Sequence, residues 1–127
     1  MNACDHRRED EVEVRLLEGI RRRCPDDDRV WRALAGLYTR VGRHEDGLAE
    51  DLKLAQAFPC EPDVWYNLAC SHALLGHVDD AFTALHTAVE HGYQNAEWMI
   101  KDKDLQPIRN DPRFNQLLAL LVKSTRP

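Results

Sequence analysis

The six histidines are the side chains of this 127-residue chain best suited to hold a metal ion. His72 and His77 are five positions apart, and so are His86 and His91. On a single α-helix five residues correspond to a rotation of about 140°, so neither pair points at one ion as residues four apart would. We therefore expect no metal site, with His72 packed between helices and the other pair in solvent. Cys4-Asp5-His6 also carries ligand atoms, but it lies in an expected tail.

The nucleophilic side chains do not form a catalytic motif. No serine or cysteine stands beside a base in a known arrangement, and the chain has neither a glycine-rich phosphate loop nor a His-Glu-x-x-His sequence. The cysteines are Cys4, Cys24, Cys60 and Cys70, and none forms a Cys-x-x-Cys pair, so we expect reduced thiols that pack as small apolar groups. These observations predict a protein that is not an enzyme and that needs no cofactor.

The charges are unevenly distributed along the chain. Residues 1–43 carry ten arginines and nine acids, residues 44–100 carry ten acids and the single cation Lys53, and residues 101–127 have a net charge of +3. The acidic middle disfavours nucleic acid as a partner, because phosphates need a basic surface. It would attract a cationic peptide, although acids on a helix often serve only to keep an outer face in water.

Several residues recur after 34 positions. This spacing separates Pro25 from Pro59, Trp31 from Trp65, Leu34 from Leu68, Ala35 from Ala69 and Gly42 from Gly76. A fixed period of this length is typical of stacked helical hairpins, each of which buries its apolar side only against a neighbour. We therefore predict an all-α fold, a right-handed α-α solenoid of stacked antiparallel helix pairs with about six or seven helices.

Apolar spacing and end signals place the helices. We expect helices at about 9–23, 29–41, 45–57, 63–75 and 79–91, and shorter pieces after Gly92. Val12, Leu16, Leu17 and Ile20 give the first helix its expected apolar face. Asp26–Asp28, Asn95, Asp104 and Asp111 are the expected N-terminal caps, and Gly42 and Gly76 are expected to end helices with a left-handed residue.

The residues at these positions resemble a known family. Trp65, Leu68, Ala69, Leu75, Gly76, Ala81, Phe82 and Ala88 look like a tetratricopeptide repeat, and Trp31, Leu34, Ala35, Tyr38, Gly42 and Pro59 look like the repeat before it. The stretch DLQPIRNDPRFNQLLALL resembles the closing unit of many bacterial arrays of this family. Asp51 departs from the pattern, because a large apolar residue is usual there. His72 departs from it as well, because it replaces the tyrosine that the first repeat keeps at Tyr38.

The resemblance implies a division of the chain. It predicts a tail at residues 1–8, a half repeat at 9–25, repeats at 28–61 and 62–95, a degenerate capping unit at 96–123 and a tail at 124–127. In this family the first helix of each pair lines a concave groove. The groove residues expected from that register are Arg29, Arg32, Arg40, Asp63, Tyr66, Asn67, Cys70 and Leu74.

The resemblance also implies a function. We expect a small interaction module that binds a protein or peptide segment in this groove, where three arginines could hold a carboxylate or phosphate. The chain matches poorly the subclass that clamps the C-terminal carboxylate of heat-shock chaperones. The alternative is a homodimer formed through the helix at 9–23, which lacks a partner helix of its own. Without an apolar run long enough to span a membrane or a recognisable secretory signal, we expect a cytoplasmic protein that contacts no membrane.

Overall fold

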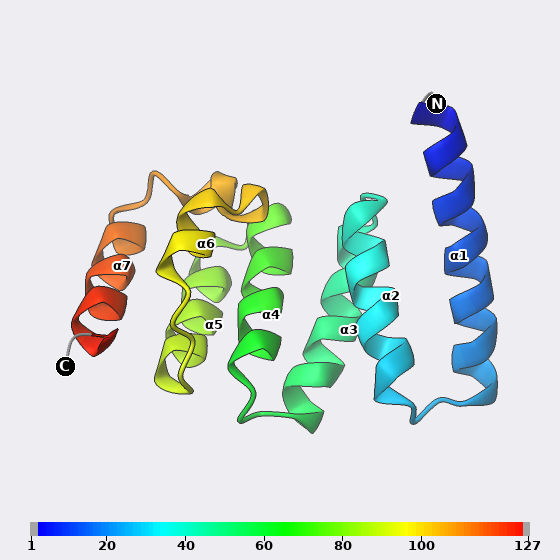
Figure 1. Cartoon of the computed structure of the whole chain (residues 1–127), viewed down its shortest axis with the longest axis horizontal. Helices are drawn as coiled ribbons and strands as arrows, with labels where there is room; N and C mark the ends of the chain where they lie inside the picture. Colours follow the sequence, from blue (N-terminus) through cyan, green and yellow to red (C-terminus); the bar gives the residue numbers. More distant parts are fainter. Residues whose placement is uncertain (1–2, 126–127) are drawn as a thin grey trace.

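The computed structural model describes residues 3–125, and it describes side chains for residues 8–123. This part of the chain contains seven α-helices and one 3-10 helix, and no strand. The elements are α1 (Ala3–Arg23), α2 (Asp28–Arg40), α3 (His44–Ala57), α4 (Pro62–Leu74), α5 (Val78–Glu90), α6 (Ala96–Lys101), η1 (Lys103–Ile108) and α7 (Pro112–Thr125). They follow one another along the long axis of the molecule, with the two ends of the chain at opposite ends (Figure 1).

The predicted all-α class with stacked antiparallel helix pairs is confirmed. The helices α2 and α3 form one pair, α4 and α5 form the next, and α3 packs against α4 between them. The helix α1 packs on α2 at one end. It begins at Ala3 instead of at about Glu9, so residues 3–8 are helical and not the expected tail, while residues 1 and 2 lie outside the described part. At the other end, α7 continues past residue 123 to Thr125, and residues 126 and 127 lie outside the described part.

The same hydrogen bond joins successive units at the start of each pair. The indole nitrogen of Trp31 donates to the carbonyl oxygen of Pro25 at 2.8 Å, and that of Trp65 donates to Pro59 at 2.7 Å. An indole N–H that packs against a core needs an acceptor, and the carbonyl of the turn proline supplies one. The 34-residue sequence period is therefore also a period of the structure.

Each pair turns at a glycine in the left-handed region. Gly42 has φ of +85° and Gly76 has φ of +78°. After these glycines, the amides of Arg43 and His77 donate to the carbonyls of Tyr38 and His72, which satisfies carbonyl groups at the helix ends. A residue with a Cβ would be strained at either glycine, and this explains why glycine recurs there.

Side chains cap the helix starts largely as predicted. Asp27 accepts a hydrogen bond from the amide of Arg29, and Asn95 accepts one from the amide of Trp98. Asp111 accepts one from the amide of Arg113 at the start of α7. The expectation for η1 was wrong by two positions, because Asp102 accepts from the amide of Asp104 and is therefore the cap.

The apolar face of α1 differs from the predicted one. Val14 is buried against Val30, Leu34, Leu37 and Tyr38 of α2, with Leu17 and Ile20 partly buried beside it. Val12 and Leu16 are instead 58% and 60% exposed. The predicted stripe mixed two sides of the helix, because Val12 and Leu16 lie one turn apart on the side opposite Val14.

The segment after Gly92 closes the other end of the array. Its buried core residues join the core that runs from α3 to α7, and they are Tyr93, Met99, Leu105, Ile108, Phe114, Leu117 and Leu121. The helix α7 packs on α5, while η1 packs on α4. The second of these contacts was not predicted, and it determines the shape of the candidate site.

Candidate functional site

A cavity of about 350 Å³ lies between α2 and α4, and we call it the α2–α4 cavity. The helix α3 and the segment α6–η1 also contribute to its walls. Its lining residues are Arg32, Ala35, Gly36, Thr39, Asp51, Leu54, Val64, Tyr66, Asn67, Cys70, Trp98, Asp102 and Asp104. First helices of both pairs line it, as the groove prediction requires, but the closing segment covers part of the surface expected from α4.

Half of the predicted groove residues line this cavity. Arg32, Tyr66, Asn67 and Cys70 do so. The remaining four, Arg29, Arg40, Asp63 and Leu74, are not among its lining residues. Asp63 is exposed near the start of α4, and Leu74 is partly buried at its end.

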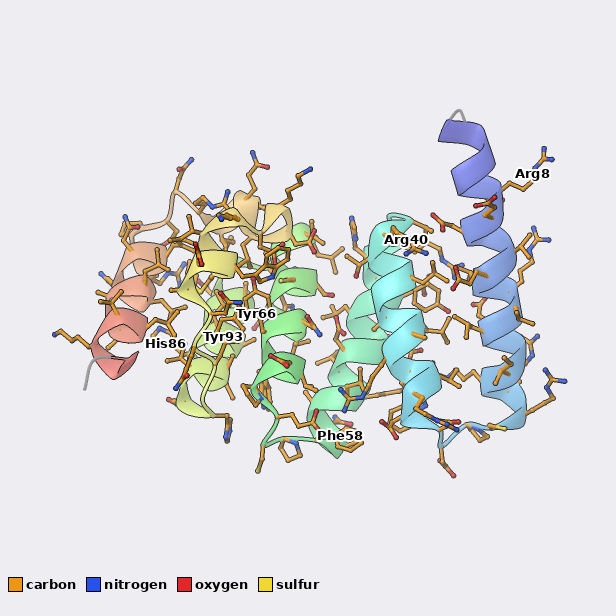
Figure 2. The ribbon with its side chains drawn as sticks, in the orientation of Figure 1. Arg8, Arg40, Phe58, Tyr66, His86 and Tyr93 are labelled. Atoms are coloured by element: carbon orange, nitrogen blue, oxygen red, sulfur yellow. The ribbon has the colours of Figure 1, made fainter. Side chains whose placement is uncertain are left out.

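The structure does not bring the three arginines of the predicted groove together. Arg40 extends from α2 toward α1, where it lies 3.0 Å from Asp10 and 3.4 Å from Glu13 (Figure 2). The side chain of Arg29 is 86% exposed and pairs with Asp27 at 2.8 Å, next to the helix start. The family resemblance assigned these arginines to the first helix of the pair, and they do lie on α2. It gave no information about the acids on α1 and at the helix cap that pair with Arg40 and Arg29.

Arg32 is the one of the three that lines the cavity. Its guanidinium pairs with Asp28 at 3.2 Å and with Glu61 at 2.9 Å, and it lies over the ring of Phe58 at 4.9 Å. The hydrogen bond that it donates to Glu61, together with the neighbouring acids, raises its pKa. The positive charge is thus already matched by two carboxylates, which reduces its attraction for an anionic ligand.

Tyr66 and Cys70 form the floor of the cavity and are not free to grip a ligand. Tyr66 is 4% exposed and stacks on Tyr93, with ring centroids 4.5 Å apart and planes 4° apart (Figure 2). Its hydroxyl donates to the Asp102 carboxylate at 2.6 Å, and the Cys70 sulfur lies 3.7 Å from the same oxygen. Burial raises the pKa of both the Tyr66 phenol and the Cys70 thiol, so both stay protonated near neutral pH.

Three carboxyl groups give the cavity its acidic character. Asp51 is 3% exposed and accepts a 2.5 Å hydrogen bond from the hydroxyl of Ser71; burial raises its pKa to about 6. Asp104 is partly buried, and burial together with the neighbouring Asp102 raises its pKa. Only one cation, Arg32, stands among the lining residues, so the balance of charge favours a cationic group.

Trp98, Asn67 and Arg32 are exposed side chains at this cavity. Trp98 lies on α6 and is 52% exposed. Asn67 lies on α4, is also exposed, and lines the same cavity. Sequence reasoning missed Trp98, Asp102 and Asp104, because the 34-residue period ends before residue 96 and gives no register there. The aspartate-rich stretch 102–104 was a signal of a capped turn, but not of its contact with α4.

Two clusters in the described residues carry potential metal ligands. In the first, ligand atoms of Cys70, Asp102 and Asp104 lie within 4.8 Å of one another. Cys70 is a buried, protonated thiol and Asp102 is committed to Tyr66, so this group is explained by the contact between η1 and α4. The second consists of His72, His77 and Asp80. It overturns the rotation argument made from the sequence, because α4 ends at Leu74 and His77 stands at the start of α5.

Comparison with known proteins gives a distant similarity. The chain is 30% identical over 90 residues to a chloroplastic protein of Arabidopsis thaliana, and the match covers 68% of this chain. It covers 27% of the Arabidopsis protein, so the chain spans about a quarter of that protein's length. No family model matches the chain, and no solved structure matches it. Within residues 3–125, no helix combines the length and the apolar character needed to cross a membrane.

Proposed function

We propose that the protein is a tetratricopeptide-like interaction module that binds an extended peptide segment of a partner protein in the α2–α4 cavity, without catalysis. The observation that carries the proposal is the cavity itself. First helices of two consecutive pairs and the closing segment build it together, and exposed Asn67 and Trp98 are among its lining residues. Such a surface offers shape and hydrogen bonds to a peptide, which is the usual role of a stacked helical array.

The charges favour a segment with a basic side chain. Asp51, Asp102 and Asp104 line the cavity, whereas Arg32 is already paired with Asp28 and Glu61. A lysine or arginine would lie beside uncompensated carboxyl groups, and its apolar stem could rest on the indole of Trp98. This reverses the preference for a carboxylate or phosphate inferred from three arginines, because two of those arginines lie elsewhere.

The family assignment is part of the proposal. The 34-residue period in sequence and structure supports it, and the 90-residue similarity to the Arabidopsis protein is consistent with relatedness. The cytoplasm is the proposed location, and the chloroplastic name of that relative makes the plastid the alternative. Microscopy of a fluorescent fusion in the source organism distinguishes the two.

A selection experiment tests peptide binding. Random peptides displayed on phage are selected on the immobilised protein, and the enriched peptides are then titrated against variants by calorimetry. Asn67→Trp fills the cavity mouth, and Gln56→Trp is its matched control, because Gln56 is an exposed amide on α3 outside the cavity. We expect binding to weaken at least tenfold in Asn67→Trp and to stay unchanged in the control.

Charge provides the second part of this test. The enriched peptides should contain lysine or arginine, and Asp104→Lys should weaken their binding at least tenfold. Binding should also weaken as salt increases, because the attraction is partly screened. Peptides that bind Asn67→Trp as tightly as the wild type, or a selection that enriches only acidic peptides, would contradict the proposal.

A second candidate function is self-association through α1. Val12 and Leu16 are 58% and 60% exposed one turn apart, on the side of α1 turned away from Val14. In a homodimer this stripe would be covered by the same stripe of a second copy. Light scattering over a range of protein concentrations tests this, and it compares the wild type with the variant Val12→Glu/Leu16→Glu. The control variant is Arg8→Glu, which changes the net charge by the same amount at a residue that points away from the body of the protein (Figure 2). A wild type that stays monomeric at all concentrations rules it out.

A further inference from the structure

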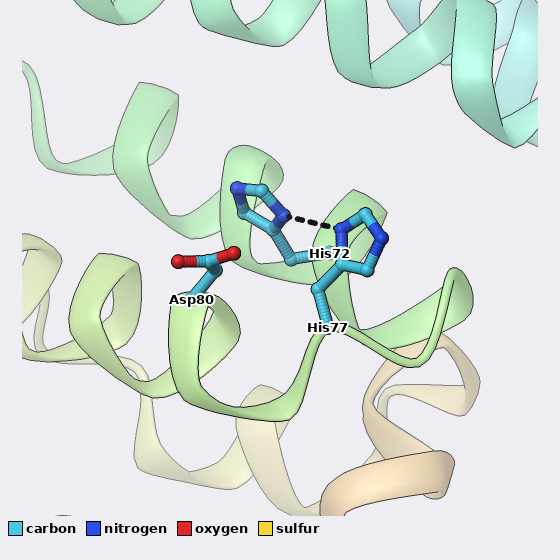
Figure 3. Close-up of side chains that lie close together, drawn as sticks. All are labelled: His72, His77 and Asp80. Atoms are coloured by element: carbon cyan, nitrogen blue, oxygen red, sulfur yellow. Dashed lines mark hydrogen bonds between the residues drawn. The ribbon is translucent and has the colours of Figure 1, made fainter.

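Three potential metal ligands meet at the turn between α4 and α5. The Nδ1 atoms of His72 and His77 lie 3.2 Å apart, and the two rings are tilted by 50° (Figure 3). One carboxylate oxygen of Asp80 completes a group in which all ligand atoms lie within 4.8 Å of one another. His77 and Asp80 are exposed and His72 is partly buried, so an ion can reach the group from solvent.

The equivalent positions of the first pair show what this turn holds when no ligands are present. Counting back 34 residues, His72, His77 and Asp80 correspond to Tyr38, Arg43 and Asp46. There the Arg43 guanidinium lies over the Tyr38 ring at 4.7 Å and donates to Asp46 at 2.7 Å. The turn therefore brings these three positions together in both pairs. In the second pair all three carry side chains that bind metals.

The backbone of the turn fixes the relative positions of the ligands. Gly76 takes φ of +78°, and the amide of His77 donates to the carbonyl of His72 at 2.9 Å. The amide of Ala81 donates to the carbonyl of His77 at 2.9 Å, which begins α5 and orients Asp80. A site on such a turn is formed before the ion binds, so little ordering of the chain opposes binding.

The distance between the two imidazole nitrogens suits one tetrahedral ion. Two Zn–N bonds of about 2.05 Å at a tetrahedral angle place the nitrogens roughly 3.3 Å apart. Without an ion, two neutral rings at this distance share a single proton in one hydrogen bond. The neutral imidazole ring is the form that donates a lone pair to a metal.

We propose that His72, His77 and Asp80 bind one divalent transition-metal ion, with Zn²⁺ as the best fit and water in the remaining position. Two nitrogen ligands and one carboxylate are a donor set that zinc accepts, whereas calcium and magnesium prefer oxygen ligands alone. The ion would bridge the end of α4 and the start of α5. In the second pair the ion would hold the three side chains of the turn together, as the contact of Arg43 with Tyr38 and Asp46 does in the first pair.

Zinc titration of untagged, metal-stripped protein tests the proposal. The measurements use the variant Cys4→Ser/His6→Gln as the background, because it removes the thiol and the imidazole near the start of the chain that could also bind zinc. Calorimetry should give one equivalent of bound Zn²⁺, and the imidazole ¹⁵N spectrum should show both Nδ1 atoms as the coordinating nitrogens. Bound zinc should also raise the midpoint of thermal unfolding, since it binds the folded form.

Variants locate the ion. His77→Gln and Asp80→Asn change exposed side chains, so the fold should persist, which circular dichroism checks. We expect zinc affinity to fall at least tenfold in each. The matched control is His86→Gln/His91→Gln, which removes the other pair of histidines five residues apart and should bind zinc as the background does. The absence of saturable binding would overturn the proposal and leave only a hydrogen bond between the rings. Undiminished binding in His77→Gln would overturn it as well.

Discussion

Ser71 on α4 donates a 2.5 Å hydrogen bond to the carboxylate of Asp51 on α3, and both side chains are buried where the first helix pair packs on the second. A polar pair thus occupies a contact for which the family resemblance predicts an apolar residue. The hydrogen bond satisfies the hydroxyl and one oxygen of the carboxylate. It also makes the contact between the pairs sensitive to protonation.

Stability should fall as Asp51 ionises. Its pKa of about 6 in the folded protein lies above the ordinary value of 3.8, so the folded state holds the proton more tightly than the unfolded state. The stabilising contribution is complete below pH 3.8 and is lost as the pH rises through 6. At about 1.4 kcal/mol per pKa unit this amounts to about 3 kcal/mol.

Asp51→Asn removes this titration while keeping the shape of the side chain. We expect the free energy of unfolding of the wild type to fall relative to that of Asp51→Asn between about pH 4 and pH 7, as measured by urea unfolding. Glu45→Gln, which alters an exposed acid on the same helix, is the control and should show no such change. A constant difference between wild type and Asp51→Asn across this range would argue against the assignment.

The two tryptophans should respond alike to substitution. Trp31→Phe and Trp65→Phe each keep an aromatic ring but remove the hydrogen bond to Pro25 or Pro59. We expect each to lower the free energy of unfolding by about 1 kcal/mol, the usual worth of one hydrogen bond. Values that differ by more than about 1 kcal/mol would show that the two junctions are not equivalent.

The hydrogen bond from Tyr66 to Asp102 should hold the closing segment on α4. Tyr66→Phe leaves the stacking on Tyr93 possible but removes the 2.6 Å bond to a buried carboxylate. We expect a loss of about 1.5–3 kcal/mol in unfolding free energy, because the acceptor is charged. The rate of amide hydrogen exchange should rise in residues 102–108 first. The control is Tyr93→Phe, which removes only the 3.2 Å hydrogen bond that the Tyr93 hydroxyl donates to the carbonyl of Asn95, and it should have a smaller effect.

The cysteines should separate into two classes of reactivity. Cys24 and Cys60 are exposed, whereas Cys70 is buried and its thiol pKa is raised by burial and by Asp102. In a Cys4→Ser variant at about pH 8, we expect Cys24 and Cys60 to react rapidly with a thiol reagent. Cys70 should react only after unfolding. Rapid reaction of a third thiol in the folded protein would show that the cavity floor opens.

The repeat period and the local signals at helix ends made the helices and turns predictable, because each rests on local chemistry. Gly42 and Gly76 end helices for conformational reasons, and Asn95 and Asp111 cap the helices that follow them. The site was predictable only in part. The partners of Tyr66 and Arg40 lie 36 and at least 27 residues away in the chain, on segments outside the period. No local pattern indicates such pairings, since they depend on how the end segments pack.

The two ends of the array are each specialised for one neighbour. The helix α1 meets α2 through Tyr38 and Arg40, whereas η1 meets α4 through Tyr66 and Cys70. Tyr38 and Arg40 correspond to His72 and Leu74 in the second pair. Tyr66 and Cys70 correspond to Arg32 and Gly36 in the first pair. None of these four residues offers the hydrogen bond that its counterpart makes to an end segment. Gene duplication that adds a unit between α3 and α4 would therefore leave both terminal junctions intact. Deletion of either pair would join an end to a helix it does not match, so the array can evolve toward greater length more readily than toward shorter length.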